Sequence, residues 1–110
     1  LNKKCVPCEG GVLPFDISEI HKYQKKVDGW NIIKNEKKNF FLNKKFNFKN
    51  FLESQEFVNK VGKISEEEGH HPDITFGWGY ALIKITTHAI EGLSENDFIL
   101  AAKIDKIINV

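Results

Sequence analysis

The chain has 110 residues, which is enough for one compact domain around a single hydrophobic core. Its formal net charge of only +1 argues against a protein that binds nucleic acid by neutralising phosphates. Hydrophobic residues make up 41% of the chain, and no apolar run is long enough to cross a bilayer, so we expect a cytoplasmic protein that does not contact membranes.

Residues 1–15 are predicted to form an irregular segment, and residues 16–110 a single folded domain. The first segment contains a Cys-x-x-Cys motif at Cys5 and Cys8, together with two prolines and two glycines. This motif alone is weak evidence, because it fits half of a zinc site, a redox pair or two free thiols. We expect no catalytic role for it. The chain begins at Leu1, and whether a targeting segment precedes it stays open.

The first regular element is predicted to be a helix that begins at the N-cap candidates Asp16 and Ser18 and runs to about Val27. Its apolar residues recur at helical spacing, and Asp28-Gly29 ends it. Two strands follow, over residues 30–33 and 40–48, joined by a polar turn. This pattern predicts a β-hairpin.

A long helix is predicted over residues 48–68, because most of its apolar side chains fall on one stripe. Gly69 suits the left-handed position just after a helix. The three glutamates of the last turn, residues 66–68, oppose the helix dipole. This unfavourable placement indicates that one of them is retained for function.

Residues 72–88 alternate between apolar and polar side chains, which predicts a second hairpin. We expected Gly79 and Tyr80 at the centre of a type II′ turn, with Gly in the first central position. That register pairs Trp78 with Ala81, Phe76 with Ile83, Ile74 with Ile85, and His71 with His88. The first three pairs would form an apolar face towards the core. The two histidines would face each other on the opposite side, with Cβ atoms about 4.5–5.5 Å apart.

The last helix is predicted to start at Ser94, with Asp97 three residues on as a capping-box acid. The full order is then helix, strand, strand, helix, strand, strand, helix. Hairpins separated by helices indicate an α+β fold, with a four-stranded antiparallel sheet and three helices packed on one face.

Three of the four histidines lie at the two ends of the second hairpin: His70, His71 and His88. Imidazole is the side chain best suited to move protons near neutral pH, so the cluster favours general acid/base chemistry. Two other interpretations are a surface histidine pair and a zinc site. The zinc site is awkward because adjacent side chains of an extended segment project apart, and we expect no metal and no cofactor.

The segment "EEEGHHPDITFGWGYALIKITTH", followed by "GLSENDFILAAKID", resembles the pterin-4a-carbinolamine dehydratases, also called the dimerisation-cofactor family. The likeness begins near residues 28–30 and runs through Asp105. It implies the same fold and the removal of water from 4a-hydroxytetrahydropterin. The product is quinonoid dihydropterin, which recycles the pterin used by aromatic amino-acid hydroxylases.

The resemblance also implies the site residues. The family's catalytic histidines fall on His70, His71 and His88, and its substrate-binding or supporting positions fall on Glu66, Gly69, Thr86, Thr87 and Asp97. Many members carry an acid where this chain has Gly69, and another where it has Ala89, so contacts at those two positions depart from the family pattern.

Several of these side chains have a structural interpretation as well as a functional one. Glu66 either orients a histidine or is only a solvated helix end, and for Asp97 we favoured helix capping. Trp78 is predicted to point into the core, whereas Trp30 could equally stack on a pterin.

The resemblance leaves one competing function. Some members of the family stabilise the dimer of a homeodomain transcription factor through a helical surface, so a non-catalytic binding module is the alternative. Self-association as a homodimer or homotetramer is also implied, and the open edges of an antiparallel sheet favour it.

Overall fold

The computed structural model describes residues 13–108. Cys5 and Cys8, and most of the predicted irregular segment 1–15, lie outside this range. The elements in chain order are α1 (Ile17–Gln24), β1 (Asn31–Lys34), β2 (Phe40–Asn47), α2 (Phe51–Glu68), β3 (Asp73–Gly77), β4 (Tyr80–Ile85), the short 3₁₀ helix η1 (His88–Ile90) and α3 (Glu95–Ile108). The predicted α+β fold and its order of elements are confirmed.

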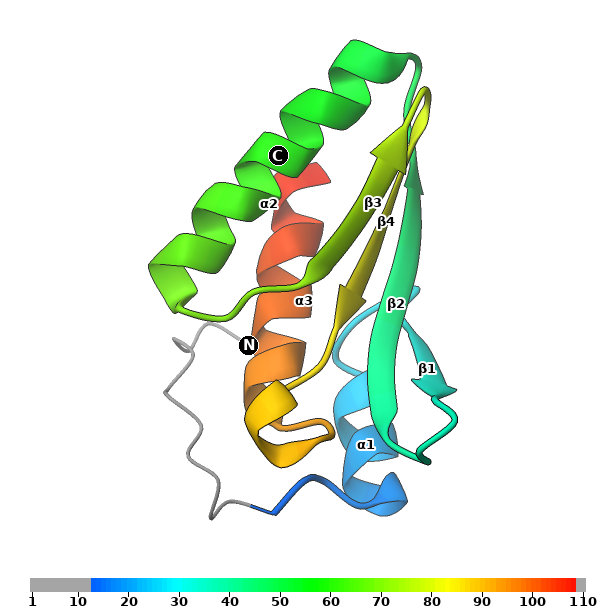
Figure 1. Cartoon of the computed structure of the whole chain (residues 1–110), viewed down its shortest axis with the longest axis vertical. Coiled ribbons are helices and arrows are strands. Elements are labelled where there is room, and N and C mark those ends of the chain that lie inside the picture. Colours follow the sequence, from blue (N-terminus) through cyan, green and yellow to red (C-terminus); the bar gives the residue numbers. More distant parts are fainter. Residues whose placement is uncertain (1–12, 109–110) are drawn as a thin grey trace.

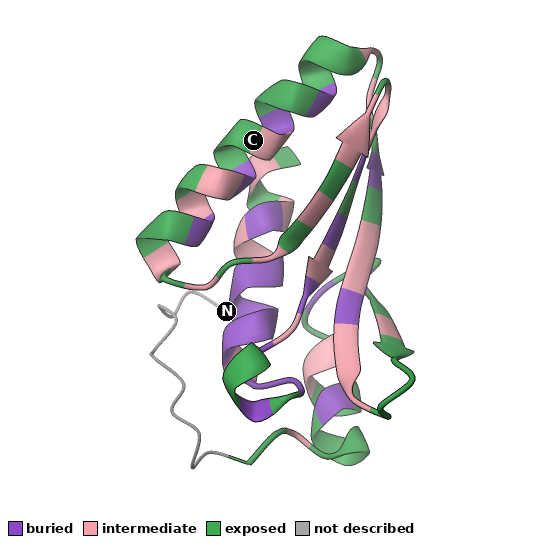
Figure 2. Ribbon diagram, in the orientation of Figure 1, coloured by how far each residue is buried: buried purple, intermediate pink, exposed green. Residues whose placement is uncertain are grey.

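The four strands form one antiparallel sheet in the order β1-β2-β4-β3 (Figure 1). Helices α2 and α3 lie side by side against it, and α1 contacts α3 (Figure 1). All three helices contribute buried side chains to one core, for example Ile20 from α1, Val61 from α2 and Phe98 from α3. Alternate residues of the strands, such as Leu42 and Ile83, complete it, so the buried positions line one side of the sheet (Figure 2).

Local capping determines where the helices begin. Asp16 caps α1 by accepting a hydrogen bond from the backbone N–H of Glu19 at 2.9 Å, within a capping box. Asn50 caps α2 in the same way, so this helix begins at Phe51, three residues later than predicted. Gly69 ends α2 with φ 65, as its position in the sequence predicted.

The second hairpin turns one residue earlier along the chain than we predicted, so the partner of each strand residue shifts by two. Ile74 pairs with Ile83 and Phe76 with Ala81, which places Trp78 and Gly79 in the turn. Gly79 has φ 79 in the second central position, where a type II turn requires a positive value, whereas a type II′ turn requires it in the first. Because the pairing shifts by two residues, the side chains that remain within the two strands keep their predicted faces of the sheet.

This register corrects two further predictions. Trp78 does not enter the core but lies 72% exposed at the tip of the hairpin. His71 and His88 are not a cross-strand pair, because β3 begins at Asp73, β4 ends at Ile85, and His88 is the first residue of η1. Trp30, by contrast, is buried in the core and donates its indole N–H to the carboxylate of Asp105 at 3.0 and 3.1 Å.

None of the helices in residues 13–108 combines the length and the apolar composition that a membrane span requires.

Candidate active site

A cavity of about 250 Å³ lies where the loop after α2 approaches the end of β4 and η1. Its lining contains six of the predicted site residues, Gly69, His70, His71, Thr86, Thr87 and His88, together with Ala89. The three histidines therefore meet around one cavity, although not through the pairing we had predicted. The remaining predicted residues, Glu66 and Asp97, each contact one of the histidines. The cavity is close in size to the pockets of about 300–1,000 Å³ that hold small ligands.

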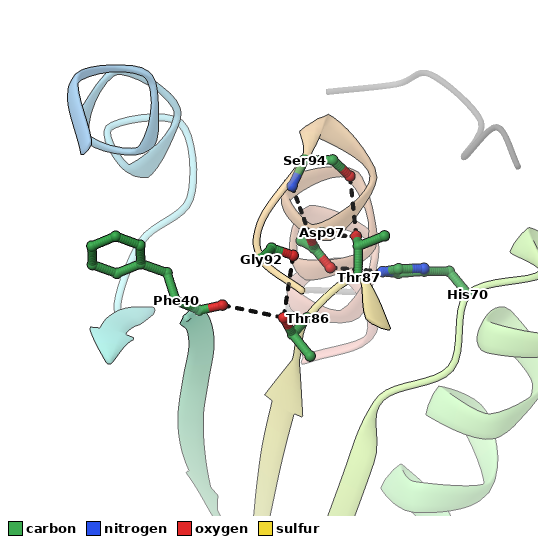
Figure 3. Close-up of polar contacts among 7 residues, drawn as sticks. All are labelled: Phe40, His70, Thr86, Thr87, Gly92, Ser94 and Asp97. Carbon is green, nitrogen blue, oxygen red and sulfur yellow. Dashed lines mark hydrogen bonds and ion pairs between the residues drawn. The ribbon is translucent and has the colours of Figure 1, made fainter. Parts of the chain in front are cut away.

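His70 is held by a buried carboxylate. Its Nε2 atom lies 2.7 Å from Oδ1 of Asp97, whose side chain is fully buried, while the His70 side chain is 13% exposed (Figure 3). A buried charge is stable only when its partners replace the hydration it has lost, and Asp97 has three such partners. Its other oxygen, Oδ2, accepts hydrogen bonds from the hydroxyl of Thr87 at 2.7 Å and the backbone N–H of Ser94 at 2.8 Å.

Asp97 therefore does two things at once. It caps the start of α3 through Ser94, as predicted from the S-x-x-D pattern, and it also fixes a histidine that is 27 residues away in the sequence. Residue spacing alone predicts only the capping contact, because the contact to His70 depends on the tertiary fold; the family resemblance placed Asp97 among the supporting residues without naming its partner. Ser94 itself was missed as part of the network, although its hydroxyl lies 3.1 Å from that of Thr87.

His71 has a partner of a different kind. Its Nε2 atom lies 2.9 Å from Oε2 of Glu66, and the two side chains are 61% and 78% exposed. The left-handed turn at Gly69 directs the chain back beside the last turn of α2, which places His71 next to Glu66. A pair this exposed contributes little to stability, about 0–1 kcal/mol.

The Thr86–His88 segment forms another part of the cavity wall. The hydroxyl of Thr86 donates to the carbonyl oxygens of Phe40 at 3.1 Å and Gly92 at 3.2 Å (Figure 3). Thr87 is buried, and its hydroxyl belongs to the Asp97 network. Both threonine hydroxyls thus have protein partners, so these residues contribute to the wall mainly through their position. The exposed ring of His88 makes no hydrogen bond or ion pair within residues 13–108.

Side chains that commonly bind metals are spread out at this site. Within residues 13–108, no three His, Cys, Asp or Glu side chains are arranged to hold a metal ion. His70 and His71 contact different carboxylates, and both use their Nε2 atoms to do so. The arrangement is instead suited to proton transfer, since it places three imidazoles around one cavity and supports two of them with carboxylates.

Comparison with known proteins agrees with the motifs in the sequence. The profile of the family described as "Pterin 4 alpha carbinolamine dehydratase" matches residues 14–107. A candidate pterin-4-alpha-carbinolamine dehydratase of Rubrobacter xylanophilus is 46% identical over 105 residues, covering 96% of this chain and 94% of that protein. A counterpart in Halorhodospira halophila is 45% identical over 106 residues, with the same coverage.

Solved structures share the fold. A transcriptional coactivator/pterin dehydratase from Brucella melitensis superposes with a TM-score of 0.77 at 24% identity, covering 86% of this chain and 97% of that one. A pterin dehydratase-like protein, described as a RuBisCO assembly factor in the alpha-carboxysome, has a TM-score of 0.61 at 26% identity and covers 72% and 88%. On the family profile and the relatives of similar length, this chain belongs to the pterin-4a-carbinolamine dehydratase family of hydro-lyases.

Proposed function

We propose that this protein removes water from 4a-hydroxytetrahydropterin by proton transfer among His70, His71 and His88, and so returns the pterin as quinonoid dihydropterin. The observation that carries the proposal is the single cavity that all three histidines line. Membership of the dehydratase family supports the same substrate class.

The reaction needs two proton transfers. The bond between C4a and its hydroxyl oxygen breaks, and the oxygen takes up a proton and leaves as water. The neighbouring ring nitrogen loses its proton, and its electrons form the new double bond to C4a. One protonated and one neutral imidazole on the cavity wall can perform both steps, and each step of this kind typically contributes about 10²–10⁴-fold to the rate.

The contacts of each histidine suggest how the roles are divided. His70 and His71 each lie beside a carboxylate that orients the ring, so we assign the general acid to one of these two. His88 makes no hydrogen bond or ion pair within the described residues, which suits it to accept a proton from the substrate. Asp97 is a positioning residue: it keeps the proton on Nε2 of His70 and leaves Nδ1 for exchange.

The decisive experiment adds synthetic 4a-hydroxytetrahydropterin to the purified protein and follows quinonoid dihydropterin by absorbance. We expect a turnover well above the spontaneous rate in the same buffer. A rate equal to that of buffer alone would overturn the proposal. It would also favour the alternative of a non-catalytic binding module, in which the helical face binds a protein partner.

Self-association is a further part of the proposal. Strand β3 lies at one edge of the sheet and β1 at the other, and an exposed strand edge can pair with a second chain. We expect a homodimer or homotetramer in solution, which sedimentation or light scattering would measure.

A further inference from the structure

A second cavity of about 250 Å³ adjoins the candidate active site. It shares Thr86 and His88 with the first cavity, so these two residues form the wall between them. The rest of its lining is distinct: Asn35, Lys37, Asn39, Phe41, Lys84 and Glu91. Nothing in the proposed proton transfers uses these six residues.

The second cavity is built from three parts of the fold. Asn35, Lys37 and Asn39 belong to the turn between β1 and β2, and Glu91 follows η1. Lys84 lies in β4 between the buried residues Ile83 and Ile85, so its side chain is on the opposite, open face of the sheet. Its Nζ atom lies 4.3 Å from the ring centroid of Phe41, which helps to hold the ammonium group at the cavity.

The lining is rich in hydrogen-bond donors and in positive charge. Within residues 13–108, neither Lys37 nor Lys84 forms an ion pair. Asn35 accepts a hydrogen bond from the backbone N–H of Asn39 at 2.9 Å through its side-chain oxygen, which leaves its NH₂ group as a donor. Glu91 is the single acidic residue in the lining. Two ammonium groups and an amide donor are suited to an anionic group rich in acceptors, such as a phosphate.

We propose that the second cavity receives the substituent at C6 of the pterin, and that it favours a substituent ending in phosphate. This inference rests on the proposed function, because it assumes that the pterin ring occupies the first cavity. C6 is bonded to the ring nitrogen next to C4a, so the first atom of the substituent lies three bonds from the reacting carbon. A ring that presents this edge to His88 directs the substituent past His88 into the second cavity.

The test compares the binding of a matched pair of ligands by calorimetry: 6-(trihydroxypropyl)pterin and its terminal phosphate monoester, with 6-methylpterin as the reference for the ring alone. We expect the phosphate ester to bind about tenfold more tightly than the neutral alcohol, which is the scale of one charge-assisted hydrogen bond. The preference should weaken as salt is added.

Three variants locate the effect. Lys84→Gln should remove most of the preference for the phosphate ester and leave the affinity for 6-methylpterin unchanged. Glu91→Gln should increase the preference, because it removes the one repelling charge. Lys45→Gln is the matched control, since Lys45 lies on the same face of the sheet, over the Tyr80 ring at 5.6 Å, and lines neither cavity.

The outcomes separate this inference from the proposed function. Equal affinity for the two matched ligands, or an unchanged preference in Lys84→Gln, would overturn the inference even if 6-methylpterin binds and the dehydratase assay is positive. If none of the three pterins binds, both the inference and the proposed function are wrong.

Discussion

His70 and Asp97 are joined by a contact of 2.7 Å between Nε2 and Oδ1, and the carboxylate has no exposed surface. The same carboxylate holds Thr87 after β4 and the backbone of Ser94 before α3. One buried side chain thus joins three segments that surround the cavity. Its loss should therefore change both the rate of the reaction and the stability of the fold.

Asp97→Asn tests this double role, because asparagine keeps the shape of the side chain and removes its charge. We expect turnover to fall at least about tenfold, through loss of the general acid/base chemistry of His70. The free energy of unfolding should fall by about 1–3 kcal/mol, because buried hydrogen bonds are lost or rearranged. Urea unfolding and steady-state turnover measure the two effects.

Ser94→Ala is the control, since it keeps the backbone N–H that donates to Asp97. Wild-type turnover in Asp97→Asn would show that the contact is only structural.

His71→Ala and His88→Ala test the proton transfers directly. Each variant should lower turnover at least about tenfold, because each removes a group that would exchange a proton with the substrate. Both rings are exposed, so the free energy of unfolding should change little. His21→Ala provides the control, since His21 is exposed on α1 and contacts Gln24 rather than the cavity. Turnover at the wild-type rate in both variants is incompatible with the proposed roles.

Glu66→Gln distinguishes a positioning residue from a solvated helix end. If Glu66 orients His71 at the cavity, the substitution should lower kcat severalfold with little change in KM. Stability should change by no more than about 0.5 kcal/mol, because the pair is exposed. Glu67→Gln, one residue along the same exposed turn, is the matched control and should leave the rate unchanged. The positioning role is wrong if the two variants have the same kcat.

The two tryptophans should respond in opposite ways to substitution by phenylalanine. Trp30 is 2% exposed and donates to Asp105, so Trp30→Phe should lower the free energy of unfolding by about 1–3 kcal/mol. Trp78 lies exposed in a turn, so Trp78→Phe should leave stability nearly unchanged. Denaturant unfolding measures the free energy of unfolding of both variants. An equal decrease in the two would contradict the observed hairpin register.

Alkaline pH should weaken the fold through Tyr23. Its hydroxyl donates to Glu95 at 3.0 Å, and this hydrogen bond raises the pKa of Tyr23 above the ordinary value of 10.0. The folded state therefore holds this proton more tightly than the unfolded state does. The contribution to stability is fully present below the unfolded pKa and is lost as pH rises through the folded one. Unfolding measured across this range should show a smaller decline in Tyr23→Phe, which keeps the ring contacts but cannot titrate.

The sequence predicted the fold more reliably than it predicted the contacts within the site. The alternation of apolar residues from Ile74 to Ile85 predicted which face of the hairpin is buried. That prediction holds although the strand pairing differs by two residues from the predicted register. The turn itself was ambiguous, because the segment GWGY offers Gly77 and Gly79 and their backbone angles depend on the folded strands. A Cβ on Gly77 would lie 2.8 Å from the Tyr80 ring, a constraint that only the structure reveals.

The three predicted histidines do line one cavity, but the arrangement that brings them there differs from the one we predicted. We expected His71 and His88 to face each other across two strands. In the structure they reach the cavity through two irregular segments, the turn at Gly69 and the start of η1. The motif resemblance does not depend on the strand register, whereas the predicted pairing of His71 with His88 depended on it entirely.

The lining of the first cavity has space for a side chain at Gly69. A Cβ built at this position meets no atom within 4 Å, and the position lines the first cavity. The obstacle to a larger residue is therefore the backbone, with φ 65, and not a lack of space. The cost of that left-handed backbone to another residue is about 1–2 kcal/mol, and less for Asn or Asp. A carboxylate introduced here would add a hydrogen-bond acceptor to the lining of the first cavity, while Glu66 and Asp97 stay beside His71 and His70.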